Sequence, residues 1–240
     1  MSYLSWISDE DLTAAVVRLV RSVTLASKKA TNNISRNGLD PFSLLFNISL
    51  LSHDVESWKL NETSRQAEKG LSNALGVFHQ EIISHVRGWE DPYTSQDFDL
   101  INHEKRIVVE MKNKHNTLNA EGQKNCFKKL ENAVSNKNSS FYQYTAYCVN
   151  IVPKKSRIGV IPFIVKDNAT DSYLSNDRVF LVDGHTFYAL ATGIQGALKE
   201  MLDILPLVLR DKKISTIDAD SVAYINLVFE ETYAHFENCE

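Results

Sequence analysis

Charged residues interrupt a buried-strand pattern between residues 96 and 116. The first half of this stretch alternates with period two, so Asp97 and Asp99 lie on one face of a predicted strand. The second half is β-branched and apolar at its centre, which is typical of a buried strand. Glu110 and Lys112 break that run and, being two residues apart, point to the same side of the sheet. The pattern predicts acids and a lysine together at one end of a sheet.

These buried charges indicate a site for a divalent cation. A carboxylate and an ammonium inside a sheet cost several kcal/mol unless another group compensates. A cation such as Mg²⁺ held by Asp99 and Glu110 would compensate, because hard cations take carboxylate and phosphate oxygens as ligands. Lys112 would then position the attacking water and stabilise negative charge on a phosphodiester. Asp97 shares the face of Asp99 and competes with it for the role of first carboxylate.

The same residues carry a resemblance to a known family. Asp99 is followed, after ten residues, by Glu110-Met111-Lys112. Other segments spread from Leu4 to Leu205 are LSWISDEDL, Asp40-Pro41-Phe42, FHQEIISHVRGWE, VEMKNKHNT, TAYCVNIVPKK and DGHTFYALATG. The spacing resembles the D…(D/E)xK signature of the PD-(D/E)XK nuclease superfamily. Together the segments resemble one group of type II restriction endonucleases, the group that cuts GGNCC-type duplex DNA.

The resemblance implies an activity and its partners. We expect a Mg²⁺-dependent endonuclease that hydrolyses both strands of double-stranded DNA at a short palindromic site and leaves 5′-phosphate ends. A homodimer is expected, because a near-palindrome has two-fold symmetry. A cognate DNA methyltransferase is implied in the same host. Glu81, on a helix that packs on the sheet in the superfamily, is a further metal ligand by resemblance, and a solvated helix acid is the alternative.

Basic and amide side chains that could bind DNA follow the motif. Eleven lysines and arginines stand between residues 105 and 157, opposed by three glutamates. A solvated face is the ordinary explanation, but beside a nuclease motif a phosphate-contacting surface is favoured. The predicted DNA-binding residues are Asn113, Lys114, His115, Asn116 and Lys124. A polar strand-exit loop is the alternative for the first four, and a solvated helix face for Lys124.

The rest of the pattern predicts an α/β fold with a restriction-endonuclease-like core, that is, a mixed central β-sheet flanked by helices. A single domain is expected over residues 1–240, with a catalytic core at about 64–165 and helical additions at 1–60 and 186–240. One helix is predicted at 8–27, and a second begins at 40 with Phe42, Leu45 and Phe46 on its apolar face. A third runs from about 64 to Gly88. Further helices are predicted at 121–135, 186–192 and 195–211, and the last from 218 or 220 to 236. Strands are predicted at 88–93, 97–101, 106–112, 141–153, 157–165 and 179–182, with loops at 28–38 and 166–177.

Two local patterns allow a more specific expectation. Asp183-Gly184-His185 predicts a turn with positive φ at Gly184. The apolar stripe of the last helix, from Val222 to Phe236, is interpreted as core, with a subunit contact as the alternative. Helix 121–135 should bury Cys126, Phe127, Leu130 and Val134.

Composition excludes several classes. Of 240 residues, 43% are apolar and the net charge is −4, which fits a globular protein and not a general nucleic-acid coat. We expect a cytoplasmic protein with reduced thiols, since three cysteines lack CxxC spacing and no signal peptide or membrane-spanning run is apparent. The absence of a GxxxxGK[ST] motif argues against ATP-driven translocation. The alternatives kept open are a structure-specific or modification-dependent nuclease of the same superfamily and a non-catalytic DNA-binding module.

Overall fold

The fold was analysed in a computed structural model that describes residues 2–33, 39–92, 98–154, 159–167 and 170–233. The chain forms two compact units. One consists of Met1–Thr13 with His79–Glu240, and the other of Ala14–Phe78. The first unit contains the sheet and the second is helical. The expectation of one domain over residues 1–240 stays a prediction.

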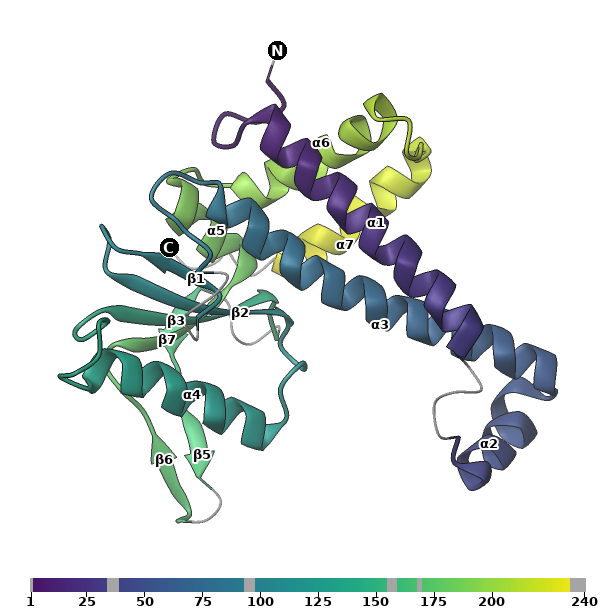
Figure 1. Cartoon of the computed structure of the whole chain (residues 1–240), viewed down its shortest axis with the longest axis horizontal. Helices are drawn as coiled ribbons and strands as arrows, with labels where there is room; N and C mark the ends of the chain where they lie inside the picture. Colours follow the sequence, from purple (N-terminus) through teal and green to yellow (C-terminus); the bar gives the residue numbers. More distant parts are fainter. Residues whose placement is uncertain (1, 34–38, 93–97, 155–158, 168–169, 234–240) are drawn as a thin grey trace. The chain divides into compact units, whose positions relative to one another are not determined.

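A five-stranded mixed sheet forms the centre of the first unit, in the order β1-β2-β3-β7-β4 (Figure 1). The strands are β1 (Leu100–Asn102), β2 (Ile107–Lys114), β3 (Thr145–Val152), β7 (Val179–Asp183) and β4 (Val160–Pro162). Strands β2, β3 and β7 are parallel, whereas β1 and β4 lie antiparallel to their neighbours. The predicted mixed sheet flanked by helices is confirmed.

Helix α4 (Ala120–Ser135) connects the parallel strands β2 and β3 and covers one face of the sheet (Figure 1). Asn119 caps the helix, because its side chain accepts a hydrogen bond from Gly122 N. The predicted inward residues Cys126, Phe127, Leu130 and Val134 are all buried. They pack against the sheet side chains Ile101, Val108, Ala146, Cys148, Val179 and Leu181. The crossover helix and its inward stripe are therefore as predicted.

Helix α5 (Gly184–Thr192) follows β7 directly and lies on the side of the sheet away from α4 (Figure 1). Asp183 caps it and accepts hydrogen bonds from Thr186 N at 2.9 Å and Thr186 Oγ1 at 2.7 Å. The predicted turn with positive φ at Gly184 is wrong, since Gly184 is the first residue of the helix. A glycine is required for a different reason. A Cβ there would lie 2.6 Å from the Ile151 carbonyl oxygen.

Three predictions around the sheet need correction. The loop predicted at 166–177 contains an antiparallel hairpin of β5 (Val165–Asp167) and β6 (Ser172–Leu174), whose strands are too short to give a clear alternating pattern. The strand predicted at 88–93 is, among the described residues, an isolated bridge between Glu90 and Ile101. The strand predicted at 157–165 is reduced to β4, and residues 155–158 lie outside the described ranges.

The C-terminal part of the described chain is helical, with α6 (Ala197–Asp211) and α7 (Ala219–Tyr233). Pro206 lies inside α6 as predicted. The core interpretation of the α7 stripe is confirmed in part for the residues described, and Val222 and Phe229 are half-buried. Tyr233 is buried, but Ile225 is 39% exposed, and Phe236 lies outside the described chain.

The second unit contains most of the long helices α1 (Asp9–Asn33) and α3 (Val55–Ser84), together with α2 (Pro41–Asn47) and the π-helix η1 (Ile48–Ser52). Helix α1 extends beyond its predicted end at 27, and α3 begins before its predicted start at 64. Helices α1 and α3 approach closely, since a Cβ on Gly70 would lie 2.5 Å from the Ala26 Cβ.

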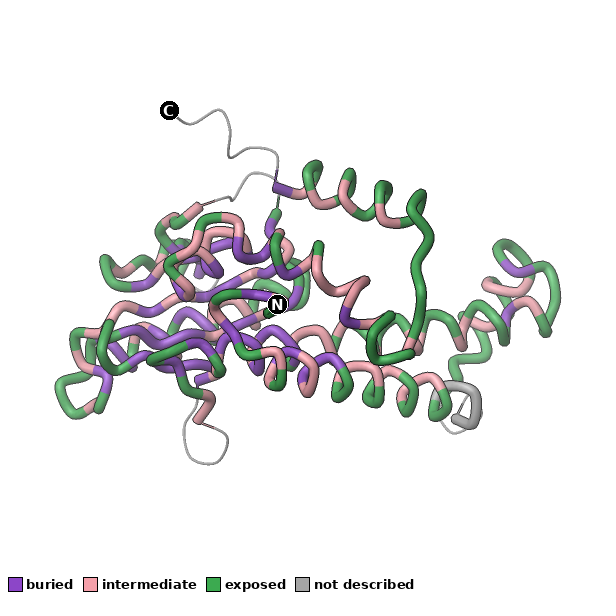
Figure 2. Tube along the Cα trace, turned by 90° about the horizontal axis from the view of Figure 1, so that it is seen from above, coloured by how far each residue is buried: buried purple, intermediate pink, exposed green. Residues whose placement is uncertain are grey.

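Helix α2 begins as predicted, with the Asp40 side chain accepting a hydrogen bond from Phe42 N. Its apolar face does not contribute to a core. Phe42, Leu45 and Phe46 are all exposed, and most of this segment is green in Figure 2. A helical stripe in the sequence identified the face correctly, but it could not tell what would cover it. None of the described helices is long and apolar enough to cross a membrane.

Candidate active site

The two predicted carboxylates lie side by side at one edge of the sheet. The β1–β2 register pairs Leu100 with Val109, so the preceding Asp99 stands opposite Glu110. Asp99 N donates to Val109 O at 2.9 Å, and Met111 N donates to the Asp99 carboxylate, Oδ2, at 2.6 Å. The side chain of Asp99 thus takes the place of a backbone acceptor where β1 begins. This bond holds the carboxylate beside β2.

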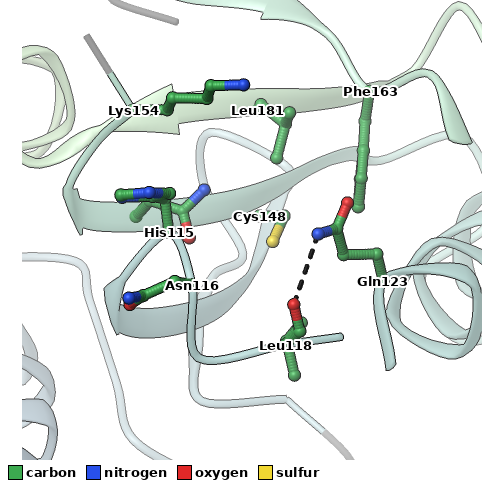
Figure 3. A pocket seen from close by; sticks show the side chains of 9 residues that line it. His115, Asn116, Leu118, Gln123, Cys148, Lys154, Phe163 and Leu181 are labelled. Atoms are coloured by element: carbon green, nitrogen blue, oxygen red, sulfur yellow. Dashed lines mark hydrogen bonds between the residues drawn. The ribbon is translucent and has the colours of Figure 1, made fainter. Parts of the chain in front are cut away.

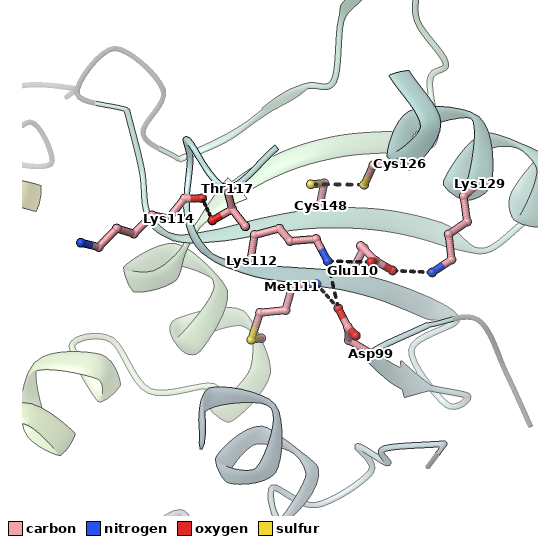
Figure 4. A network of polar contacts seen from close by, with 9 residues as sticks. All are labelled: Asp99, Glu110, Met111, Lys112, Lys114, Thr117, Cys126, Lys129 and Cys148. Atoms are coloured by element: carbon pink, nitrogen blue, oxygen red, sulfur yellow. Dashed lines mark hydrogen bonds and ion pairs between the residues drawn. The ribbon is translucent and has the colours of Figure 1, made fainter. Parts of the chain in front are cut away.

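Two lysines bind the Glu110 carboxylate, one on each oxygen (Figure 4). Lys112 Nζ lies 2.7 Å from Oε1, and Lys129 Nζ, from α4, lies 2.7 Å from Oε2. Lys112 Nζ is also 3.8 Å from Asp99 Oδ2. The Glu110 side chain is 13% exposed, so these contacts are largely screened from water. The structure therefore brings Asp99, Glu110 and Lys112 together and adds Lys129 to them.

The pKa directions describe the electrostatics of this group. Burial, and then repulsion from Glu110, raise the pKa of Asp99 above its usual value. Burial lowers the pKa of Lys112, but attraction to Glu110 and Asp99 outweighs this and leaves it raised. Lys112 is therefore an ammonium donor at neutral pH and not a general base. The surroundings of Asp99 oppose its ionisation.

The donor set fits a hard divalent cation. Asp99 and Glu110 supply carboxylate oxygens, which are the ligands that such cations prefer. The surroundings of Asp99 disfavour its charged form, and a nearby cation would favour that form. Within the described ranges, no group of three or more His, Cys, Asp or Glu side chains is arranged for a metal ion. Glu81 is buried near the end of α3, and its role as a ligand stays a prediction. Asp97, the competing carboxylate, lies outside the described residues.

The predicted DNA-binding residues divide into two groups. Lys114, His115 and Asn116 are exposed at the end of β2 and just beyond it. Asn113 is buried, because its side chain points to the opposite face from Lys112. Lys124 forms an ion pair with Asp167 at 2.7 Å, and this pair would have to open before Lys124 could reach a phosphate.

A cavity of about 330 Å³, whose lining is drawn in Figure 3, opens on the face of the sheet that carries the Glu110 and Lys112 side chains. Two of its lining residues on β3 show this placement, since Cys148 pairs with Glu110 and Asn150 pairs with Lys112. Its polar lining is His115, Asn116, Gln123, Asn150 and Lys154, and its apolar lining is Leu118, Cys148, Phe163 and Leu181. An apolar lining with a small number of polar groups is the usual composition of a ligand site.

Sequence reasoning did not find Asn150 and Gln123, and it included Lys129 and Lys154 only among the eleven basic residues of the expected phosphate-contacting surface. Lys129 follows Cys126 by three positions and precedes Ala133 by four, so it borders the inward stripe of α4. That position was a usable signal, since a helix covering the motif strand directs its border residues toward the strand. The position of Asn150 depends on the parallel register with β2, which the sequence does not specify.

Comparison with known proteins decides the family. The model of the Eco47II restriction endonuclease family matches residues 4–214. The chain belongs to this family.

Two similar enzymes show how far the likeness extends. The type II restriction enzyme Eco47II of Escherichia coli is 38% identical over 207 residues, which cover 86% of each protein. The type II restriction enzyme Sau96I of Staphylococcus aureus is 28% identical over 214 residues, covering 87% of this chain and 80% of that enzyme. The predicted resemblance to type II restriction endonucleases is confirmed, and with it the class of site-specific deoxyribonuclease.

Proposed function

We propose that this member of the Eco47II family is a Mg²⁺-dependent endonuclease that cuts both strands of a short palindromic DNA site and leaves 5′-phosphate ends. The observation that carries the proposal is the carboxylate pair Asp99 and Glu110, with Lys112 Nζ 2.7 Å from one and 3.8 Å from the other. The GGNCC type of the site rests on the sequence resemblance.

The side chains have separate tasks in this proposal. Asp99 and Glu110 are the ligands of a divalent cation, which supplies Lewis acidity and neutralises charge that develops on the phosphodiester. Met111 N keeps the Asp99 oxygen in place. Lys112, whose raised pKa keeps it charged, leaves Glu110 and donates to the attacking water and to a non-bridging phosphate oxygen. Glu81 would complete the ligands from α3.

The DNA strand is proposed to pass the end of β2 and the cavity beside it. Lys114, His115 and Asn116 are exposed there and suit contacts with phosphates. Asn113 joins this surface only if its buried side chain becomes accessible. Lys124 joins it only if its ion pair with Asp167 opens. The amide groups of Asn150 and Gln123, which line the cavity, suit hydrogen bonds to base edges.

The proposed partners follow from the reaction. A homodimer places one site on each strand, which matches the two-fold symmetry of a palindrome and is the economical arrangement for cutting both strands. The host of a restriction enzyme must protect its own DNA, so a cognate methyltransferase is proposed in the same, cytoplasmic, compartment.

Plasmid cleavage with end sequencing tests the proposal. Purified protein is incubated with plasmid and Mg²⁺, and with the chelator EDTA as the control. We expect discrete fragments only with Mg²⁺, with 5′-phosphate ends that share a GGNCC-type sequence. A random smear, or intact plasmid under every condition, would contradict the proposal. Cutting of branched or methylated DNA alone would support the structure-specific or modification-dependent alternative.

A further inference from the structure

A short segment of the helical unit exposes its apolar side chains. Phe42, Leu45 and Phe46 on α2 and Leu50 and Leu51 on η1 are each 58–73% exposed, and they are called here the apolar patch. The spacings of three and four residues from Phe42 to Leu50 place their side chains along one side of the helical path. Exposed leucines and phenylalanines are common singly, but a contiguous group of this size marks an interaction site.

Polar contacts at the end of the same segment join it to α3 through one buried side chain, Ser52. Ser52 is 6% exposed and donates from its hydroxyl to Asn47 Oδ1 at 2.9 Å. Asn61 Nδ2 of α3 donates to Ser52 Oγ at 3.2 Å. The i→i+5 pattern of a π-helix brings Ser52 over Asn47, which makes the first of these bonds possible. The apolar patch is thus fixed on the outside by a polar network that joins α2, η1 and α3 on the inside.

The composition of the patch suits contact with a copy of itself. No charged side chain occurs from Pro41 to Ser52, so two such surfaces meet without like-charge repulsion. A large apolar side chain offers roughly 150–200 Å² when fully accessible, so the five residues offer on the order of 500–600 Å². Flanking Leu39, Val55 and Leu60 are also exposed. With them the patch approaches the roughly 800 Å² that one partner contributes to a standard interface.

We propose that the apolar patch is the dimer interface of this protein, in which α2 and η1 of one copy pack on α2 and η1 of a second copy. A two-fold contact of this kind joins one surface patch to itself, which an uncharged apolar surface allows. The choice of a second copy as the occupant rests on the proposed function, because cleavage of both strands of a palindrome calls for two copies.

Helix α7 is the rival apolar surface, since Tyr224 and Leu227 are exposed on it. Two observations favour the patch on α2 and η1. The family model matches residues 4–214, so it includes α2 and η1 and ends before α7 begins at Ala219. Helix α7 also carries Asp220 near its start and Glu230 and Glu231 near its end, whereas the segment from Pro41 to Ser52 carries no charged residue.

Sedimentation equilibrium of the full chain over a concentration series tests the interface. We expect the wild type to have twice the mass of one chain. Leu45→Glu combined with Leu50→Glu should weaken association about 100-fold or more, because two charges would enter an apolar interface. Leu227→Glu is the matched control, since Leu227 is 54% exposed and Leu45 is 58% exposed, and it should remain a dimer. Circular dichroism checks that the variants fold.

Each other outcome overturns the proposal. These outcomes are a wild type that stays monomeric at all concentrations, a double variant that still dimerises, and a dimer lost only in Leu227→Glu. A wild-type monomer that binds vesicles of anionic lipid would assign the patch to a membrane surface instead. Plasmid cleavage by the same wild-type samples separates the two proposals. A monomer that cuts DNA overturns only the interface, and a dimer that never cuts overturns only the nuclease function.

Discussion

The charged edge of the sheet and the apolar patch on α2 and η1 depart from ordinary protein architecture in opposite directions. At the sheet edge, Asp99, Glu110 and Lys112 place charges among buried strands. In the patch, leucines and phenylalanines face water while Ser52 is enclosed. Stability alone favours neither arrangement, because buried charges and exposed apolar surface both cost free energy. The comparison teaches that each region is incomplete without a partner. We propose that the partner of the sheet edge is a cation together with DNA, and that the partner of the apolar patch is a second copy of the chain.

The largest expected effect is loss of cleavage at the charged edge. Glu110→Ala and Lys112→Ala should each lower the single-turnover rate of plasmid cleavage by about 10³-fold or more, because each removes a ligand or donor used in the transition state. DNA binding, measured by fluorescence anisotropy in Ca²⁺, should change little. Lys114→Ala is the control, since this exposed lysine should affect binding more than rate. Cleavage at the wild-type rate by either variant would show that the site lies elsewhere.

A smaller effect separates two of the three lysines of α4, which form ion pairs of equal length. Lys129 binds Glu110 at 2.7 Å and Lys124 binds Asp167 at 2.7 Å. Lys129→Met should lower the cleavage rate at saturating DNA about 10- to 100-fold, because it alters the charge on a proposed metal ligand. If the Lys124–Asp167 ion pair opens and Lys124 contacts a phosphate, Lys124→Met should instead weaken the salt dependence of DNA binding. The slope of log binding constant against log salt concentration should then become less steep by about one unit. Equal rates for the two variants would remove Lys129 from the site.

The surroundings of Asp99 disfavour its charged form, so replacing Asp99 with a neutral residue should stabilise the folded protein. The raised pKa means that the folded protein holds this proton more tightly than the unfolded chain does. The associated stability is therefore present at low pH and is lost as pH rises through the raised pKa. In cation-free protein, Asp99→Asn should raise the Tm by a few degrees at neutral pH, with no gain below the usual Asp pKa of about 3.9.

Asp218→Asn is the control of opposite sign. Hydrogen bonds from Ser221, first its backbone N–H and then its hydroxyl, lower the pKa of Asp218. Its charge therefore adds stability at neutral pH, and the Asn variant should have a slightly lower Tm there. A Tm difference for Asp99→Asn that does not vary with pH would show that its charge is not opposed.

The smallest expected effect belongs to the apolar patch within a single copy. At concentrations too low for association, Leu45→Glu should change the free energy of unfolding by less than about 0.5 kcal/mol, because the side chain is already in water. Leu100→Ala, at a residue with no exposed surface, should lower it by about 2–5 kcal/mol. Urea unfolding of both variants measures the contrast. A large loss for Leu45→Glu would mean that this leucine packs inside the monomer.

The sequence was most informative where neighbouring residues determine the outcome. Glu110 and Lys112 share a strand, so their common face follows from a period of two, and the stripe of α4 follows from helical spacing. Lys129 and Asn150 join the site only through the packing of α4 and the register of β3, which are long-range properties. The patch shows the same limit. Spacing identified Phe42, Leu45 and Phe46 as one apolar face, but burial depends on what lies opposite.

The hydrogen bond from Met111 N to Asp99 has a consequence for engineering this enzyme. Since main-chain geometry fastens the carboxylate, its location is insensitive to repacking of nearby side chains. Lengthening the residue to glutamate would keep the charge yet carry the oxygens past the amide that anchors them. Attempts to retune ion preference are therefore better directed at Lys129, whose long, partly exposed side chain leaves room for graded substitution.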